Sequence, residues 1–78
     1  MKQQITMQQL KEIKGKAWKN LLDYCTENGK SSVLLTFGDM VEFLVRHKDY
    51  VFLGNLEQNN PEEWTDLLWH FVKCELKK

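Results

Sequence analysis

The chain of 78 residues contains eleven basic and eleven acidic side chains, is 42% hydrophobic, and includes three Trp, four Phe and two Tyr. This length limits it to one domain with one small core, and the aromatic content excludes a disordered tail. The neutral net charge removes the general attraction to phosphate that most nucleic-acid-binding proteins show. No apolar run approaches the roughly 20 residues of a membrane span, so we expect no membrane partner.

The first predicted helix spans residues 7–28. Thr6 and Gln9 have the spacing of a capping box, in which each side chain accepts a hydrogen bond from the other residue's backbone. Gly29 is placed to end the helix in the left-handed conformation. Gly15 lies on the polar side and weakens the helix without interrupting the apolar pattern.

The second predicted helix spans residues 37–47, and Thr36 with Asp39 repeats the capping-box spacing at its start. Two short β-prone runs flank this helix, at residues 33–35 and 50–53. They could pair as a minor two-stranded element, although runs this short fit buried coil equally well.

The third predicted helix spans residues 61–76, with Asn60 as its cap and Pro61 at its first position. The residues expected to face the core are Trp64, Leu67, Leu68, Phe71 and Val72. Trp69 and Leu76 extend the apolar arc beyond that face, toward polar neighbours. Because so small a core covers only one face of a helix, we expect these two side chains to form a second contact surface. The predicted fold is a mostly α, three-helix domain over residues 1–78.

Cysteine and histidine residues are the only candidates for metal binding, and they are Cys25, His47, His70 and Cys74. His70 and Cys74 are four residues apart on a helix, which suits two zinc ligands, but no Cys-x-x-Cys pair accompanies them. A buried thiol, an exposed thiol and two solvated histidines explain the same residues. The sequence carries no catalytic or phosphate-binding motif, so we expect no metal, no cofactor and no enzymatic activity.

The two cysteines are too few for a disulfide framework, and residues 1–10 are polar and unlike a secretory signal. These features predict a cytoplasmic protein.

One segment, residues 34–44 (LLTFGDMVEFL), combines a leucine pair, a capping Thr, a Gly and a Met-x-Glu-Phe-Leu motif. Together with the Leu-Trp pair at residues 68–69, it resembles a loose group of short phage and prophage proteins from low-GC Gram-positive bacteria. The chain departs from that pattern at Asp39, where Gln is expected, and in the short connection before the last helix. The resemblance implies a bacterial host cell and an accessory protein that binds and blocks a host or defence protein. It implies no catalytic residues.

These observations favour a protein-binding module whose contact residues are Trp69, Leu76 and Tyr50. Trp and Tyr contribute strongly to interfaces because they bury a large area at a small entropic cost. The same residues would serve equally well in a homodimer interface, or Trp69 and Leu76 could cover the core beneath residues 48–60. The alternative function is that of a DNA-binding or transcriptional accessory protein, which would use the lysine-rich first helix.

Overall fold

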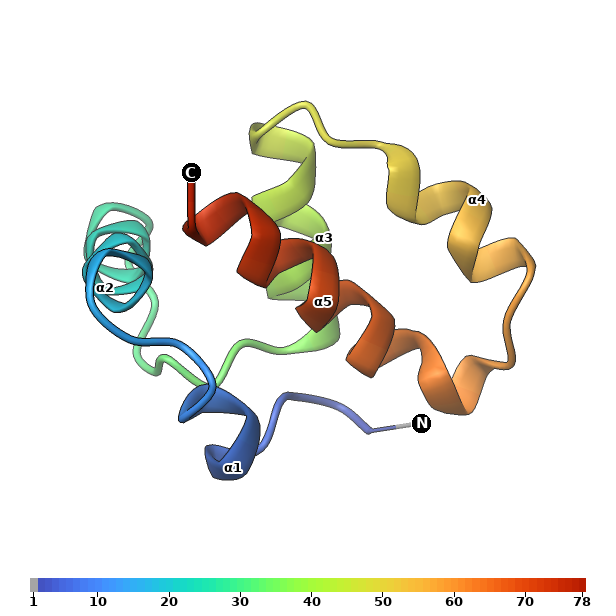
Figure 1. Ribbon diagram of the computed structural model, residues 1–78, viewed down its shortest axis with the longest axis horizontal. Coiled ribbons are helices and arrows are strands. Elements are labelled where there is room, and N and C mark those ends of the chain that lie inside the picture. The colour runs from blue at the N-terminus through green and yellow to red at the C-terminus, as the bar shows by residue number, and fades with distance from the viewer. Residues whose placement is uncertain (1) are drawn as a thin grey trace.

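A computed structural model describes residues 2–78 and is almost entirely helical. In chain order its elements are α1 (Met7–Leu10), α2 (Lys16–Glu27), α3 (Phe37–Arg46), α4 (Val51–Glu57), the 3-10 turn η1 (Pro61–Glu63) and α5 (Trp64–Leu76). In the described part of the chain, the only β pairing is an isolated antiparallel bridge between Gln4 and Thr36. The predicted mostly α fold is confirmed, with two short helices in addition to the three long ones (Figure 1).

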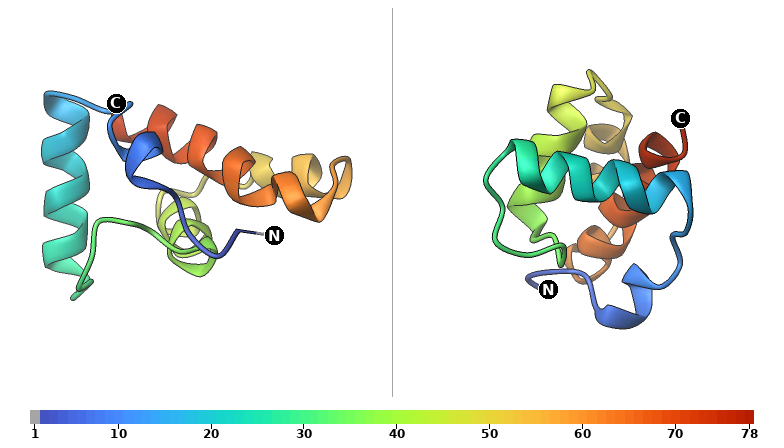
Figure 2. Two further views of the ribbon diagram at one scale, coloured as in Figure 1. Left: turned by 90° about the horizontal axis from the view of Figure 1, so that it is seen from below. Right: turned by 90° about the vertical axis from the view of Figure 1, so that its left-hand side faces the viewer.

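The last helix, α5, lies at the centre of the molecule and packs against α2, α3 and α4. Figure 1 shows α2 and α4 at opposite ends of the longest axis, with α5 extending between them, and Figure 2 shows α2 running across α5 rather than along it. The core residues come from every helix, and the most deeply buried are Leu21, Leu35, Met40, Leu44, Leu68 and Val72.

The starts of α1 and α3 have the predicted capping boxes. The Gln9 amide donates to Thr6 Oγ1 at 3.1 Å and the Thr6 amide to Gln9 Oε1 at 3.0 Å. Thr36 and Asp39 make the same two bonds, both at 3.0 Å. The predicted cap at Asn60 is wrong, because its side chain makes no capping bond and η1 precedes α5.

The predicted helix over residues 7–28 is broken into α1 and α2. Gly15 adopts φ 60° and ψ −127°, a conformation that residues with a Cβ rarely reach, so the helix cannot pass through it. Between the two helices, Ile13 is buried in the core. The predicted end at Gly29 is confirmed: Gly29 has φ 65°, and the Lys30 amide donates to the Cys25 carbonyl at 2.9 Å.

The predicted pairing of residues 33–35 with residues 50–53 is wrong. Residues 51–57 form α4, and the Asp49 carboxylate accepts a bond from the Val51 amide at 3.2 Å near its start. Residues 33 and 34 form a bend, and the chain just after it contacts the N-terminal residues: the Ile5 amide donates to the Leu35 carbonyl and the Phe37 amide to the Gln3 carbonyl, both at 3.0 Å.

The N-terminal segment also makes hydrogen bonds and an ion pair with α5. The Thr65 hydroxyl donates to the Lys2 carbonyl at 2.6 Å, and the Lys2 ammonium lies 2.6 Å from the Asp66 carboxylate. The Gln9 amide group donates to the same carboxylate at 2.7 Å. The start of α5 is therefore held by the N-terminal segment and α1 together.

Candidate interaction surface

Two of the three predicted contact residues lie in the core, so the expectation that Trp69 and Leu76 form a second contact surface is wrong. Trp69 and Leu76 are each only 2% exposed. The expectation was wrong because α5 is covered on several sides, by α2, α3 and α4, whereas a helical wheel assumes one covered face. The indole N–H of Trp69 is also satisfied internally, since it donates to Glu12 Oε1 at 2.9 Å.

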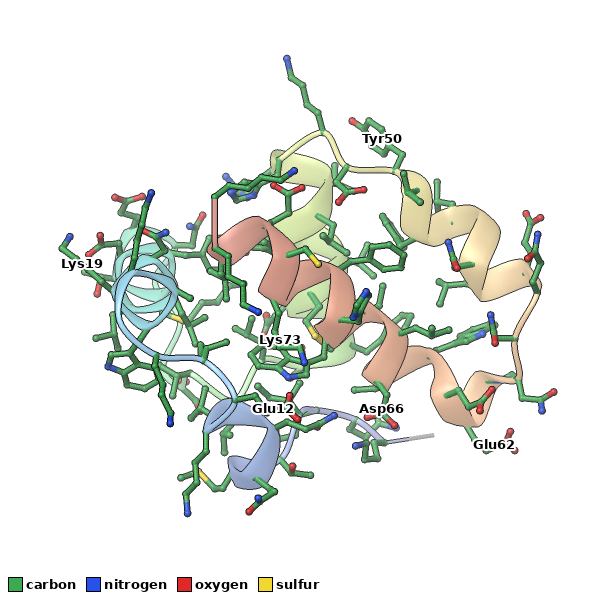
Figure 3. All side chains as sticks on the ribbon, in the orientation of Figure 1. Glu12, Lys19, Tyr50, Glu62, Asp66 and Lys73 are labelled. Atoms are coloured by element: carbon green, nitrogen blue, oxygen red, sulfur yellow. The ribbon has the colours of Figure 1, made fainter. Side chains whose placement is uncertain are left out.

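The connection between α1 and α2 supplies the polar cover for this side of α5. Glu12 accepts bonds from Trp69 and from the Lys73 ammonium, both at 2.9 Å. The bonds from Lys73 and Trp69 lower the pKa of the Glu12 carboxyl below its usual value. Figure 3 shows Glu12 and Lys73 lying together between α1 and α5.

The third predicted residue, Tyr50, lies where a contact surface requires it. Tyr50 is 52% exposed, and Val51 and Leu53 beside it are 64% and 53% exposed. Figure 3 shows Tyr50 projecting from the start of α4. Phe52 is buried and Leu56 packs on the core, so α4 is attached by one side only. We call the exposed residues Tyr50, Val51, Leu53 and Gly54 the α4 face.

Gly54 is at the centre of this face, and the fold does not explain it. A Cβ placed at Gly54 meets no atom within 4 Å, and its backbone is ordinary helix. A glycine inside a helix costs about 1 kcal/mol relative to alanine. Its effect here is to leave the helix backbone uncovered among three apolar side chains.

Charged residues lie on both sides of the α4 face in the chain: Lys48 precedes it, and acidic residues follow it. Residues 49–72 contain five acidic side chains and no Lys or Arg. Within residues 2–78, Glu57, Glu62 and Glu63 form no ion pair. The indole of Trp64 donates to the carbonyls of Leu56 and Asn59, which fixes η1 beside the end of α4. We call Glu57, Glu62 and Glu63 the acidic rim.

The opposite end of the molecule, around α2, carries both lysines and carboxylates. Of the lysines near the start of α2, Lys19 pairs with Asp23 at 3.0 Å and Lys16 donates to the Lys78 main-chain oxygen at 2.8 Å, whereas Lys11 and Lys14 form no ion pair with any carboxylate of residues 2–78. Two apolar residues lie on the same helix, four positions apart: Trp18 is partly buried and Leu22 is 40% exposed.

An open cleft of about 350 Å³ lies among α2, α3 and the end of α5. Its lining residues are Asn20, Tyr24, Glu27, Phe43, His47, Glu75, Leu76 and Lys78. Most of its polar groups bond within the chain: Glu75 pairs with Lys78 at 3.0 Å, and His47 Nδ1 lies 2.8 Å from the Phe43 carbonyl. Burial raises the pKa of the Tyr24 hydroxyl. The cleft is therefore a weaker candidate for binding than the α4 face.

The two cysteines among the candidate metal ligands differ in exposure. Cys25 is buried, and burial raises the pKa of its thiol, while Cys74 is exposed. Among residues 2–78, no group of three or more His, Cys, Asp and Glu side chains could hold a metal ion. None of the helices in the same range is long and apolar enough to span a bilayer.

Comparison of the chain with protein-family models, curated proteins and solved structures found no match. Functional inference therefore depends on the surface itself.

Val51 and Leu53 were not predicted to belong to this surface. The signal that could have found them is the spacing of Phe52 and Leu56, which are four residues apart. If these two residues belong to a helix and both face the protein core, then Tyr50, Val51 and Leu53 must point away from the core.

Proposed function

We propose that this protein is a small protein-binding module and that the α4 face is its contact surface. The observation that carries the proposal is the exposure of Tyr50, Val51 and Leu53 on one short helix. Apolar side chains grouped on the surface of a small domain mark interaction sites, because their burial against a partner releases water. Tyr50 supplies the kind of aromatic anchor that dominates interface energies.

The proposed partner is a host or defence protein, which this protein would inhibit by occupying its surface. Support for this part comes from the resemblance of residues 34–44 to phage and prophage accessory proteins. The α4 face replaces the surface around Trp69 and Leu76, whose side chains are unavailable to a partner.

The test is capture of the partner from a bacterial host lysate, with Leu53→Gln and Leu22→Gln as matched variants. Both leucines are exposed on helices, and glutamine keeps the helix propensity, so both variants should fold. We expect the wild type and Leu22→Gln to retain the same partner and Leu53→Gln to lose it. With the purified partner, calorimetry should show at least about a tenfold weaker Kd for Leu53→Gln. If Leu53→Gln and Tyr50→Ala both bind the partner as tightly as the wild type does, the proposal is refuted.

As a second candidate we propose DNA binding, for which the lysines near the start of α2 are the supporting observation. The break at Gly15 distributes these lysines over a connection and a helix start instead of one long helix. A salt titration with duplex DNA distinguishes the two functions. Affinity that falls steeply between about 50 and 200 mM salt indicates several phosphate contacts.

A further inference from the structure

Residues 50–60, which include α4, are attached to the rest of the molecule by few interactions. Figure 1 shows α4 at one end, joined to α3 and to α5 by stretches of irregular chain. Phe52 is the only buried residue of this segment, and Leu56 packs on the core four positions later. No ion pair of residues 2–78 reaches the segment. The closed position of α4 therefore depends largely on one buried side chain.

The hydrogen bonds of this segment are local. The Val51 amide donates to the Asp49 carboxylate, and the side chains of Asn55 and Asn59 donate to carbonyls four positions earlier. In the described chain, the bonding partner farthest away in sequence is Trp64. Its indole nitrogen lies 3.0 Å from the Leu56 carbonyl and 3.1 Å from the Asn59 carbonyl. A single indole N–H thus joins the segment to α5 by hydrogen bonds.

Two residues lower the local stability of the segment. Gly54 lies inside a helix of only seven residues, where the backbone freedom of glycine favours the unfolded form. Lys48, just before the segment, has φ 56°, a conformation that residues with a Cβ seldom adopt. Both residues regain conformational freedom when the segment leaves the core.

We propose that residues 50–60 form a lid that opens from α5 as one unit while α2, α3 and α5 remain folded. The contacts of α5 with α2 and α3 do not involve the lid, so they persist when it opens. Lys48 and Asn60, at its two ends, are the hinges. Opening withdraws Phe52 from the core and disperses the α4 face, whose side chains are grouped only on the closed helix.

Native-state hydrogen exchange of the full chain, followed by NMR, measures this opening at individual amides. We expect the amides of α4 to exchange at least about tenfold faster than the slowest amides of α5, and to share one degree of protection. The indole N–H of Trp64 should be exposed by the same event, because carbonyls of the lid protect it.

Two variants separate lid opening from unfolding of the whole domain. Ile13→Val shortens a buried side chain between α1 and α2, outside the lid. It should accelerate the slowest α5 amides roughly twofold to tenfold and leave the α4 amides unchanged, because Ile13 stays packed when the lid opens. Trp64→Phe keeps an aromatic ring but removes the indole donor, so it should accelerate the α4 amides by about twofold to tenfold. Circular dichroism verifies that both variants are folded.

Three outcomes overturn the inference. In the first, the α4 amides of the wild type are as strongly protected as those of α5. In the second, Ile13→Val accelerates both groups by the same factor, which shows that α4 opens only when the whole domain unfolds. In the third, Trp64→Phe leaves the exchange of the α4 amides unchanged.

This inference goes beyond the proposed function and is tested without a partner. An α4 that never opens separately refutes the lid and leaves binding through the α4 face intact. Failure to capture a partner refutes the proposed function and leaves the exchange result intact.

Discussion

The helices α5 and α4 both carry several large apolar residues, yet the structure uses them in opposite ways. On α5, Trp69 and Leu76 are enclosed by three other helices. On α4, Tyr50, Val51 and Leu53 are more than half exposed, because this helix packs mainly on α5. Apolar content alone does not distinguish a core helix from a contact helix. The number of elements that pack against a helix distinguishes the two.

The largest expected difference between these helices is in the stability of truncation variants. Trp69→Ala should lower the free energy of unfolding by about 3–5 kcal/mol, because it removes a fully buried indole and leaves a cavity. Tyr50→Ala should change it by no more than about 0.5 kcal/mol, since an exposed side chain has little packing to lose. Urea denaturation of both variants measures the difference. Equal losses would contradict the assignment of α5 as core and α4 as surface.

Acid should weaken the attachment of α5 and leave α4 unaffected. Hydrogen bonds from Lys73 and Trp69 lower the pKa of Glu12, and the bond from Lys2 lowers that of Asp66. A carboxyl with a lowered folded-state pKa contributes stability above its unfolded-state pKa, about 4, and loses that contribution as the pH falls through the folded value. Urea midpoints should therefore be level from about pH 7 to 5 and decline toward about pH 3.

The control for this acid effect is Glu12→Gln, which still accepts hydrogen bonds but carries no titrating charge. We expect it to be less stable than the wild type at neutral pH and to show a smaller decline in acid. If Glu12→Gln combined with Asp66→Asn declines as steeply as the wild type, the acid sensitivity has another source.

A smaller effect is expected at the turn that leads into α4. The helices α2 and α3 end in the same hydrogen-bonded motif, with Gly29 at φ 65° in one and Lys48 at φ 56° in the other. The left-handed conformation costs a non-glycine residue about 1 kcal/mol. Lys48→Gly should therefore raise the free energy of unfolding by about 1 kcal/mol, as measured by thermal or urea unfolding. Lys48→Ala should bring no gain, which separates the backbone effect from loss of charge.

A small gain in stability is also expected at Gly54. Gly54→Ala should stabilise the protein by about 0.5–1 kcal/mol, because the added methyl group meets no atom and alanine favours the helix. The same substitution should weaken binding of the partner proposed for the α4 face, which calorimetry with the purified partner measures. A variant that is more stable and binds as well as the wild type would show that no partner approaches the backbone at this point.

Local sequence signals predicted the parts of the fold that depend on neighbouring residues. Both capping boxes and the end of α2 at Gly29 follow from hydrogen bonds within a few positions, and all three are present. The break before α2 was missed because a glycine in a helical pattern is also compatible with a continuous helix. The helix α4 was missed because a helix of seven residues depends on tertiary packing more than on propensity.

The candidate surface was predicted only in part, because it too depends on how the helices pack together. Tyr50 is exposed, as a contact residue must be, whereas Trp69 and Leu76 were expected at the surface and are buried. A helical wheel gives the width of an apolar arc, but the arrangement of the other helices decides how much of that arc is covered.

The bond between Thr65 and the Lys2 carbonyl joins residues 63 positions apart, and it has a consequence for synthesis. The helix that covers the apolar sides of α2, α3 and α4 follows all three in the chain, so these helices emerge from the ribosome before their main packing partner exists. A chain that stops within α5 therefore displays nearly the whole apolar interior, and we expect cellular proteases to remove such fragments quickly.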